Sequence, residues 1–427
     1  MKNFELNIVK HLIRIKVQKL FFGRYISKIQ QKKWSRKKKE LNASPFYSNL
    51  NLRGKSLTEF PILNKEVFMR EFDQINTLGI ELESAFNLAE KSEKSRDFSP
   101  MINGLTVGLS SGTSGNRGVF LASSDERAQW VAAVLDRVIG LSLRKRSVAF
   151  FLRANSNLYD SIKSNMLQFE FFDLLSECDI HVKRLNKLNP TILVAQPSLL
   201  LELAHEFREG KLSIKPEKII SVAEVLYPED KEFLESTFGQ TIHQVYQCTE
   251  GFLASTCKNG ILHFHEDFFI IEKNYLDEDK TRFHPIITDL ERKSQPVIRY
   301  ELNDIIQAQE SCSCGSNWLA IKTIEGRSDD ILIFDDKDGK SKIIFPDFFR
   351  RAIIMASESI REYCLIQSST TALELFIVGD DQSYKNVEQS IFDLLDQQDI
   401  TGITINPIDS TKTEKGSKLR RIRNESN

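Results

Sequence analysis

The chain has 427 residues, of which 41% are hydrophobic and 27% charged, and its formal net charge at pH 7 is −1. This length exceeds what a single hydrophobic core normally covers, so we expect two domains, and the balanced charge gives no global argument for nucleic-acid binding. No apolar run approaches the roughly 20 residues that cross a bilayer, and charges interrupt the N-terminus where a secretory signal needs an apolar core, so we expect a cytoplasmic protein without a transmembrane segment.

The N-terminal segment, residues 1–57, is strongly basic. Its first forty residues contain thirteen Lys or Arg and two Glu. Apolar side chains recur at near-helical spacing, interrupted once by Lys19, and this pattern predicts a basic amphipathic helix. They are Ile8, Leu12, Ile15, Phe22 and Ile26. The helix either packs on the main domain and leaves its basic face in water, or contacts a membrane surface or an acidic partner.

Residues 109–121, LSSGTSGNRGVFL, combine three glycines with four small hydroxyl side chains. Glycine clusters mark backbone that turns tightly or approaches a ligand closely, because glycine has no Cβ. The spacing does not fit the G-x-x-x-x-G-K-[ST] nucleotide loop, yet converging N–H groups and hydroxyls suit a polyphosphate. The segment is therefore either a phosphate-binding loop or a plain surface turn.

Strand-like and helix-like segments alternate from residue 58 to about 330. The predicted strands are 147–154, 191–197, 218–226 and 241–248, and the predicted helices are 123–139, 197–210 and 228–239. Such alternation favours an α/β domain with a substantial parallel sheet.

The cysteines form a second pattern. Six are too few for a disulfide framework in a chain of this length, so we expect them to be reduced. Cys312 and Cys314 would lie on one side of an extended segment, and Cys257 and His263 would face each other across a hairpin. These four side chains suit tetrahedral Zn²⁺ in a structural site, because four protein ligands leave no open position. Otherwise they are reduced structural cysteines, and His265 could replace His263.

The pattern changes beyond residue 330. Strands are predicted at 363–369, 372–381 and 402–408, and a helix at 385–398. This order predicts a small α+β lobe.

Four segments stand out in chain order. They are SSGTSGNRG (110–118), VYQCTEG (245–251), IRYELNDI (298–305) with EGRSDDIL (325–332), and KGSKLRRI (415–422). Together they resemble the motifs of the adenylate-forming superfamily, in the branch around phenylacetate–CoA ligase and the deazaflavin-coenzyme synthetases. The resemblance implies a large α/β domain with mixed and parallel sheets at 58–328, and we expect the basic helical segment 1–57 to pack on it. It also implies a small mobile C-terminal domain at 329–427 that bends about Asp329.

The same resemblance implies an ATP-binding site in the large domain. Ala223 and Glu224 match the turn that flanks adenine, and Tyr246 would stack on the base unless it is a core aromatic. The phosphate cradle would consist of Ser110, Ser111, Gly112, Thr113, Ser114 and Gly115.

The expected catalytic residues are Thr249, Glu250 and Lys418. Thr249 would bond a phosphate and Glu250 would hold Mg²⁺, a hard cation that prefers oxygen ligands. Lys418 would act as a mobile cation beside the α-phosphate, or else belongs to a frayed basic tail. By the resemblance, Asp304 and Arg327 bind the ribose hydroxyls; as an alternative, they pair only with each other.

We therefore expect an ATP-dependent, AMP-forming ligase that adenylates an aryl or fatty acid and passes the acyl group to CoA or a carrier-protein thiol. In one alternative AMP stays on a hydroxyl or carboxyl acceptor, and in another the chain is a degenerate nucleotide-binding partner. Arg153, Asn155, Asn157 and Tyr159 either line the acceptor pocket or pack in the interior. Some relatives of phenylacetate–CoA ligase show a Cys/His arrangement similar to the one above, and a homodimer is a further expectation.

Overall fold

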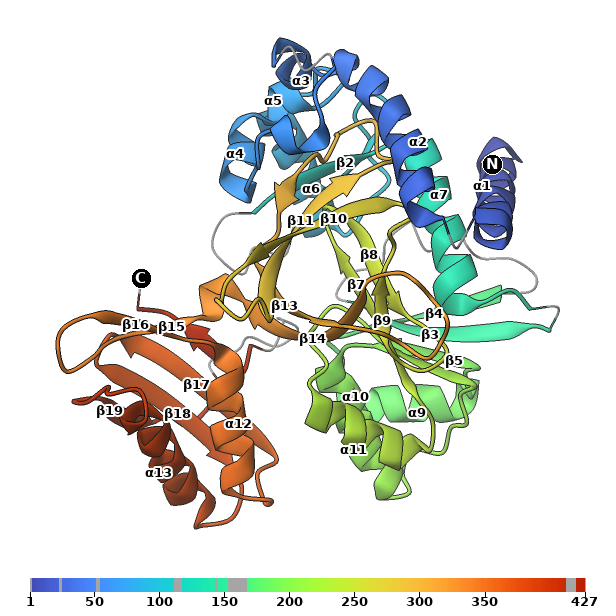
Figure 1. Cartoon of the computed structure of the whole chain (residues 1–427). Coiled ribbons are helices and arrows are strands. Elements are labelled where there is room, and N and C mark those ends of the chain that lie inside the picture. Colours follow the sequence, from blue (N-terminus) through green and yellow to red (C-terminus); the bar gives the residue numbers. More distant parts are fainter. Residues whose placement is uncertain are drawn as a thin grey trace. The chain divides into compact units, whose positions relative to one another are not determined.

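The computed structural model describes residues 2–22, 25–50, 54–110, 117–142, 144–152, 167–411 and 420–426. The chain divides into two compact units, which are Met1–Leu302 with Ile306–Thr323, and Asn303–Ile305 with Ile324–Asn427 (Figure 1). The division falls inside β13 (Asp304–Gln309) and β14 (Ala320–Arg327). The domain boundary predicted between residues 328 and 329 lies just after β14.

The N-terminal segment begins with two helices where the sequence pattern predicts one. α1 (Lys2–Phe22) is separated from α2 (Ile26–Glu40), because Tyr25, with φ −117° and ψ 47°, leaves the helical region. The prediction of one helix that continues through Ile26 is therefore wrong. In the described part of the chain, no helix combines the length and apolar character that crossing a membrane requires.

One side of α1 packs along α7 (Ser124–Val134), where Ile8 and Ile15 are buried and Lys19 is exposed. The helix α2 packs through Trp34, whose ring meets that of Phe60 edge to face. The further α-helices of this region are α3 (Pro45–Asn49), α4 (Lys65–Arg70), α5 (Phe72–Ile75) and α6 (Leu82–Ser95).

A mixed sheet forms the centre of the first unit. The order of its described strands is β10-β11-β13-β14-β9-β8-β7-β6-β5-β3-β4, and β12 pairs with β11. The bounds are β3 (Arg146–Leu152), β4 (Leu167–Asp173), β5 (Ile192–Ala195), β6 (Lys218–Ser221), β7 (Ile242–Cys248), β8 (Gly251–Thr256), β9 (Leu262–Phe264), β10 (Phe269–Tyr275), β11 (Arg282–Asp289) and β12 (Tyr300–Glu301). Neighbouring strands from β4 to β7 run parallel, so the predicted parallel sheet is confirmed. From β7 to β9 the pairing is antiparallel.

Helices cover the parallel part of the sheet. They are α9 (Cys178–Leu188), α10 (Pro197–Arg208) and α11 (Pro228–Phe238). Both α10 and α11 begin at a proline, which suits the first turn because N–H groups there have no partner within the helix. Gly239 ends α11 with a φ of 66°, a left-handed conformation that glycine adopts readily. Their apolar faces enclose a core with Phe151, Phe172 and Leu200.

A separate hairpin, β1 (Thr106–Leu109) with β2 (Val119–Ala122), packs against α6. Val107, Leu121 and Phe72 belong to the small core under it.

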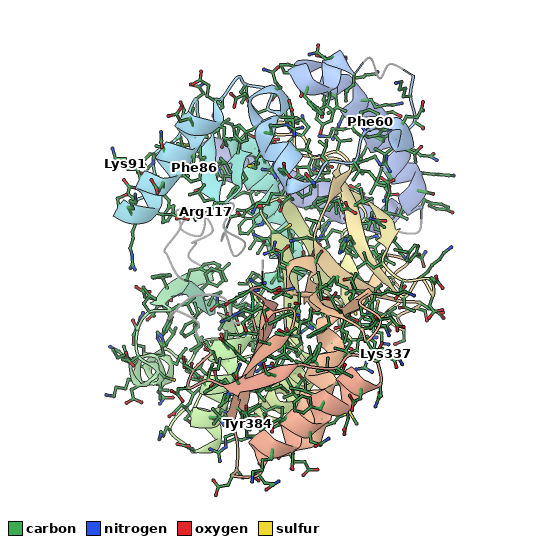
Figure 2. The ribbon with its side chains drawn as sticks, turned by 90° about the vertical axis from the view of Figure 1, so that its left-hand side faces the viewer. Phe60, Phe86, Lys91, Arg117, Lys337 and Tyr384 are labelled. Atoms are coloured by element: carbon green, nitrogen blue, oxygen red, sulfur yellow. The ribbon has the colours of Figure 1, made fainter. Side chains whose placement is uncertain are left out.

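The second unit is an α+β lobe, as predicted. Its sheet order is β19-β18-β17-β20, and Figure 2 labels Lys337 and Tyr384 on this unit. The elements are β15 (Leu332–Asp335), β16 (Ser341–Ile344), α12 (Pro346–Ala356), β17 (Glu362–Ser369), β18 (Ala372–Val378), α13 (Ser383–Asp396), β19 (Thr404–Pro407) and β20 (Ile422–Asn424). Phe334, Phe349 and Leu365 lie in its core.

Candidate functional site

The carboxyl ends of β3, β5, β6 and β7 share one edge of the sheet, because each strand runs parallel to its neighbour. In open α/β sheets this edge is where ligands bind. Residues 222–224 follow β6 here and residues 249–250 follow β7. The segment after β3, with Arg153, Asn155, Asn157 and Tyr159, lies outside the described residues, so its pocket or packing role stays a prediction.

The turn after β6 is strained. Ala223 has a φ of +70°, and the Glu224 N–H donates to the Val222 carbonyl at 2.9 Å, which together make a γ-turn of the rare left-handed kind. A residue other than glycine held in such a sparsely populated backbone region costs roughly 1–3 kcal/mol. The Glu224 carboxylate accepts from the Ser198 N–H in the first turn of α10 at 3.3 Å. Backbone strain of this kind concentrates at ligand sites, and here it falls on the predicted adenine-flanking residues.

Thr249 and Glu250 are the two connecting residues of the β7–β8 hairpin, since Cys248 pairs with Gly251. The Thr249 hydroxyl donates to a Glu250 carboxylate oxygen at 2.9 Å. The Arg292 guanidinium donates to the Thr249 carbonyl at 3.0 Å and to the Glu250 carbonyl at 3.3 Å. A fixed cation therefore holds the backbone of the turn.

Arg292 also connects this turn to β2, the strand that follows the glycine-rich loop. It donates to the Leu121 carbonyl at 3.0 Å and to the Gln295 side-chain oxygen at 2.8 Å. Gln295 in turn accepts from the Leu121 N–H and donates to the Val119 carbonyl. Arg292 and Gln295 were not predicted from the sequence, because nothing in the local pattern around them indicates that they connect two hairpins far apart in the chain.

The base of the glycine-rich loop is closed by its own residues. The Ser110 N–H donates to the Gly118 carbonyl at 2.8 Å, and the Gly118 N–H donates to the Ser110 hydroxyl oxygen at 2.7 Å. Arg117 pairs with Glu93 of α6 at 2.7 Å, and Figure 2 shows it beside this helix. Ser111, Gly112, Thr113, Ser114 and Gly115 lie outside the described residues, so the phosphate cradle stays a prediction.

Tyr246, the predicted adenine-stacking residue, is only 9% exposed. Its ring lies 6.2 Å from that of Phe264 in an edge-to-face arrangement. The next residue, Gln247, accepts a hydrogen bond from the Trp130 indole at 3.1 Å. This burial agrees with the alternative in which Tyr246 is an aromatic residue of the core. The stacking of Tyr246 on adenine stays a prediction.

The predicted ribose residues belong to the second unit. Arg327 pairs with Asp329 at 3.0 Å and donates to the Asn303 side-chain oxygen at 3.3 Å. The Asn303 amide donates to the same Asp329 carboxylate at 3.1 Å. The alternative in which Arg327 pairs only with Asp304 is therefore wrong, because the chain reversal at residues 328–330 brings Asp329 back onto the guanidinium.

Asp330 anchors the described residues that follow Lys418. It accepts from the Arg420 guanidinium, with the Nε contact at 2.7 Å. Burial raises the pKa of this carboxyl, although Arg420 and Arg327 oppose the shift. Lys418 itself lies outside the described residues, and its catalytic role stays a prediction.

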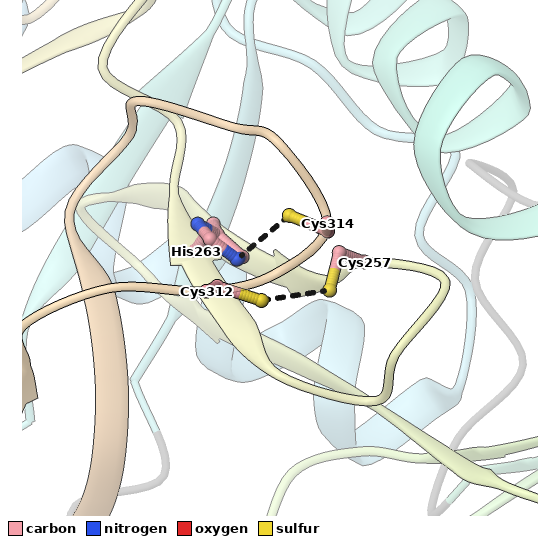
Figure 3. Close-up of side chains that lie close together, drawn as sticks. All are labelled: Cys257, His263, Cys312 and Cys314. Carbon is pink, nitrogen blue, oxygen red and sulfur yellow. Dashed lines mark hydrogen bonds between the residues drawn. The ribbon is translucent and has the colours of Figure 1, made fainter.

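The predicted metal-ligand set does come together. The ligand atoms of Cys257, His263, Cys312 and Cys314 all lie within 4.8 Å of one another (Figure 3). The Cys257 and Cys312 sulfurs are 3.8 Å apart, and the Cys314 sulfur is 3.5 Å from His263 Nε2. A tetrahedral site with Zn–S near 2.3 Å and Zn–N near 2.0–2.1 Å has edges of about 3.8 Å and about 3.5 Å. Both distances therefore fit zinc.

The geometry that joins these ligands differs from the predicted one. His263 pairs with Ser255 across the hairpin, and Cys257 lies in the turn beyond the end of β8. Cys312 and Cys314 lie in a tight turn rather than an extended segment, since the Gly315 N–H bonds back to the Cys312 carbonyl. The four ligands therefore come together because the turn at Cys257 and the turn at Cys312–Cys314 converge, and not because the ligands share one face of a strand.

His265 is not the alternative ligand. Its Nε2 lies 2.9 Å from the Ser255 hydroxyl, and its Nδ1 lies 2.9 Å from the Phe252 carbonyl, so both ring nitrogens are used. Burial lowers its pKa well below the usual value. His263 differs, because its Nδ1 lies 3.1 Å from the Trp318 carbonyl while its Nε2 faces Cys314. A backbone partner of this kind fixes the ring of a metal-binding histidine.

Backbone donors complete the surroundings of the sulfurs. The Asn259 N–H points to the Cys257 sulfur and the Ser316 N–H to the Cys314 sulfur, each at 3.4 Å. The Asn259 amide also donates to the Ser313 hydroxyl at 3.0 Å, which ties the two ligand-bearing turns together. Such donors stabilise negative charge on thiolates.

No family model and no curated protein matches the chain. Among solved structures, a 2-hydroxyisobutyryl-CoA ligase in the postadenylation state with 2-HIB-AMP is similar over 94% of this chain and 88% of its own, at TM-score 0.64 and 16% identity. A benzoate CoA ligase from Burkholderia xenovorans LB400 is similar over 76% and 69%, at TM-score 0.53 and 14% identity. A structure from a study of fatty acyl-adenylate ligases of E. coli and L. pneumophila is similar over 74% and 68%, at TM-score 0.54 and 13% identity.

These likenesses define a fold class: the chain has the fold of the adenylate-forming acyl-CoA and aryl-CoA ligases. The resemblance to that superfamily, which the four sequence segments predict, is confirmed at the level of the fold. The narrower resemblance to phenylacetate–CoA ligase stays a prediction.

Proposed function

We propose that the protein is an ATP-dependent, AMP-forming ligase that activates a carboxylic acid. The carrying observation is the carboxyl edge of the parallel sheet. At this edge, the strained turn at Ala223 follows β6, and the turn at Thr249–Glu250, which Arg292 holds, follows the adjacent strand β7. The chain has the fold of the ligases. The similar structures described above are CoA ligases and adenylate ligases, and their chemistry supports this choice.

Each candidate residue has a role in this proposal. Residues 110–115 and the Thr249 hydroxyl bind the phosphates of ATP, and Ala223, Glu224 and Tyr246 border adenine. Glu250 offers Mg²⁺ the carboxylate oxygens that this ion prefers. Bound Mg²⁺ supplies positive charge that polarises the phosphates. Asp304 and Arg327 hold the ribose.

The proposed chemistry has two halves. An oxygen of the substrate carboxylate attacks the α-phosphorus, the bond to the β-phosphate breaks, and pyrophosphate leaves with its electron pair. Lys418 offsets the charge that develops, as a preorganised cation does at a phosphoryl centre. A thiol of CoA or of a carrier protein then attacks the acyl carbon and AMP leaves. Movement of the small unit about Asp329 would let one site host both halves.

Pyrophosphate exchange into ATP, measured with a panel of aryl and fatty acids, tests the first half. We expect exchange with at least one acid, and release of AMP that depends on CoA or a carrier thiol. AMP that accumulates on the acceptor instead of appearing free would replace the ligase by an adenylyltransferase. ATP binding without exchange for any acid would leave the degenerate nucleotide-binding partner.

Two variants separate catalysis from binding. Glu250→Gln removes the anionic ligand and should lower exchange by about a hundredfold or more, while Glu278→Gln on an exposed turn should not. Lys418→Ala should lower exchange to a similar degree and leave ATP affinity nearly unchanged, with Lys415→Ala as its control. Loss of nucleotide binding in Lys418→Ala would contradict the assigned role.

We further propose that Cys257, His263, Cys312 and Cys314 hold one structural Zn²⁺. The support is the donor set of three sulfurs and one nitrogen, the two distances that match tetrahedral edges, and the backbone partner of His263. Four protein ligands leave no open position, so the ion would join two turns of the large unit rather than take part in catalysis.

Metal analysis of the purified protein tests the zinc proposal. We expect about one zinc per chain, lost in Cys312→Ser but kept in Cys178→Ser, whose thiol lies on α9. The contradicting outcome is a protein that contains no metal after purification with added zinc and whose four side chains still react as free groups. In that case the cysteines would be reduced structural cysteines.

A further inference from the structure

The helix α1 has two apolar faces, and the structure covers only one of them. Ile8, His11 and Ile15 are buried on the side toward α7. The opposite side carries large apolar side chains that are between 46% and 77% exposed. They are Leu6, Val9, Ile13, Val17 and Leu20.

These five residues form one continuous stripe. Their spacings of three, four, four and three residues keep them on one side of a helix with 3.6 residues per turn. With a rise of 1.5 Å per residue, the stripe extends about 21 Å from Leu6 to Leu20. Scattered exposed apolar residues need no explanation, but a continuous stripe of this length on a surface helix does.

The exposed charged side chains of α1 and α2 are mainly positive, with Glu5 as an acidic one. Some of the N-terminal cations bind buried acids or backbone of the large unit. They are Arg14, Lys33 and Arg36 at Glu291, Lys16 at Asp136, and Lys37 at the Arg292 carbonyl. Lys10, Lys19, Lys28, Lys32 and Lys39 are also exposed, and their ammonium groups can reach a partner outside the protein. The last three share one face of α2, because they are spaced by four and seven residues. The whole chain carries a net charge of −1, so this excess is local.

Tyr25 lies between the two helices and is more than half exposed, with the Lys28 ammonium 5.1 Å above its ring. A half-exposed tyrosine with a neighbouring lysine is typical of the boundary between lipid and water. An apolar stripe, flanking lysines and an interfacial tyrosine together match a helix that lies in the plane of a membrane surface. Lysine stems can cover apolar surface while their ammonium groups reach the phosphates.

We propose that the stripe of α1 docks on the surface of an anionic lipid bilayer, with the exposed lysines of α1 and α2 at the headgroup phosphates. The helix lies on the membrane and does not cross it, which agrees with the hydropathy of the described helices. The lysines select an anionic surface, because each one near such a surface strengthens binding about fivefold. This docking is independent of the reaction proposed above.

Co-sedimentation of the full chain with vesicles tests the proposal. We expect binding to vesicles of phosphatidylcholine mixed with phosphatidylglycerol and much weaker binding to phosphatidylcholine alone. Replacing Leu6, Ile13 and Leu20 together by Gln, a good helix former, should weaken binding by about a hundredfold or more. Replacing Lys28, Lys32 and Lys39 together by Gln should weaken it on the mixed vesicles and change little on the neutral ones.

The matched control is Met355→Gln, which removes an 84% exposed apolar side chain of the second unit and should bind like the wild type. Circular dichroism checks that each variant keeps its helix content. Failure of the wild type to bind mixed vesicles, or equal binding by the apolar triple variant, overturns the proposal. A dimer that the apolar triple variant converts to a monomer, without vesicle binding by the wild type, assigns the stripe to a second copy instead.

Discussion

Glu291 holds both N-terminal helices, so its neutralisation tests how they are attached. The carboxylate is 7% exposed and lies 3.2 Å from Arg14 of α1. It also lies 2.6 Å from Lys33 and 3.3 Å from Arg36 of α2. Burial by itself would raise the pKa of Glu291, but the cations, above all Lys33 and Arg14, lower it from 4.5 to about 2.

The size of the effect follows from this shift. A pKa difference of roughly 2.5 units corresponds to about 3 kcal/mol of stability at neutral pH. Because the pKa is depressed in the folded state, the contribution is present above the unfolded pKa near 4.5 and is lost as the pH falls toward about 2. Glu291→Gln also removes the carboxylate that three cations share, and breaking a buried ion pair such as Lys33–Glu291 costs about 3–5 kcal/mol.

Urea unfolding followed by tryptophan fluorescence measures this stability. Trp34 is the tryptophan on α2, where its ring contacts Phe60. We expect Glu291→Gln to be less stable than the wild type by about 3 kcal/mol at pH 7, with the difference shrinking as the pH approaches about 3. Glu5→Gln, on the exposed side of α1, is the control. A Glu291→Gln protein within about 0.5 kcal/mol of the wild type, or a difference independent of pH, would refute the reasoning.

Two further predictions concern the turns of the candidate site. Ala223→Gly should raise the free energy of unfolding by about 0.5–1 kcal/mol in thermal or denaturant unfolding. Glycine removes the strain of the positive φ, and this gain exceeds the entropy that glycine loses on folding. A loss of stability, as at an ordinary position, would mean that the turn is unstrained. A zinc chelator should lower the melting temperature of the wild type and leave that of Cys312→Ser unchanged, whereas equal melting curves with and without chelator for both proteins would argue against a bound ion.

Local patterns in the sequence determined much of the architecture. The alternation of apolar strands with amphipathic helices gave β3, β5, β6 and β7 and the small lobe, because side-chain periodicity is a property of short segments. The residue types of the Cys/His set also predicted a metal site, since Cys and His are the ligands that structural zinc prefers.

Tertiary structure decided what those residues touch. His263 and His265 are indistinguishable as potential ligands in the sequence, and only the packing of Phe252 and Ser255 around His265 removes it from the set. Arg292 became part of the site because two hairpins far apart in the chain fold against it.

The helix α1 shows the same division. Its sequence is apolar on two faces, and periodicity alone cannot say which face is covered, because burial depends on a partner segment more than one hundred residues away. α7 covers Ile8 and Ile15, and the stripe from Leu6 to Leu20 stays exposed. The sequence therefore determined many of the helices and strands and which residues can do chemistry, while long-range packing determined which of them meet.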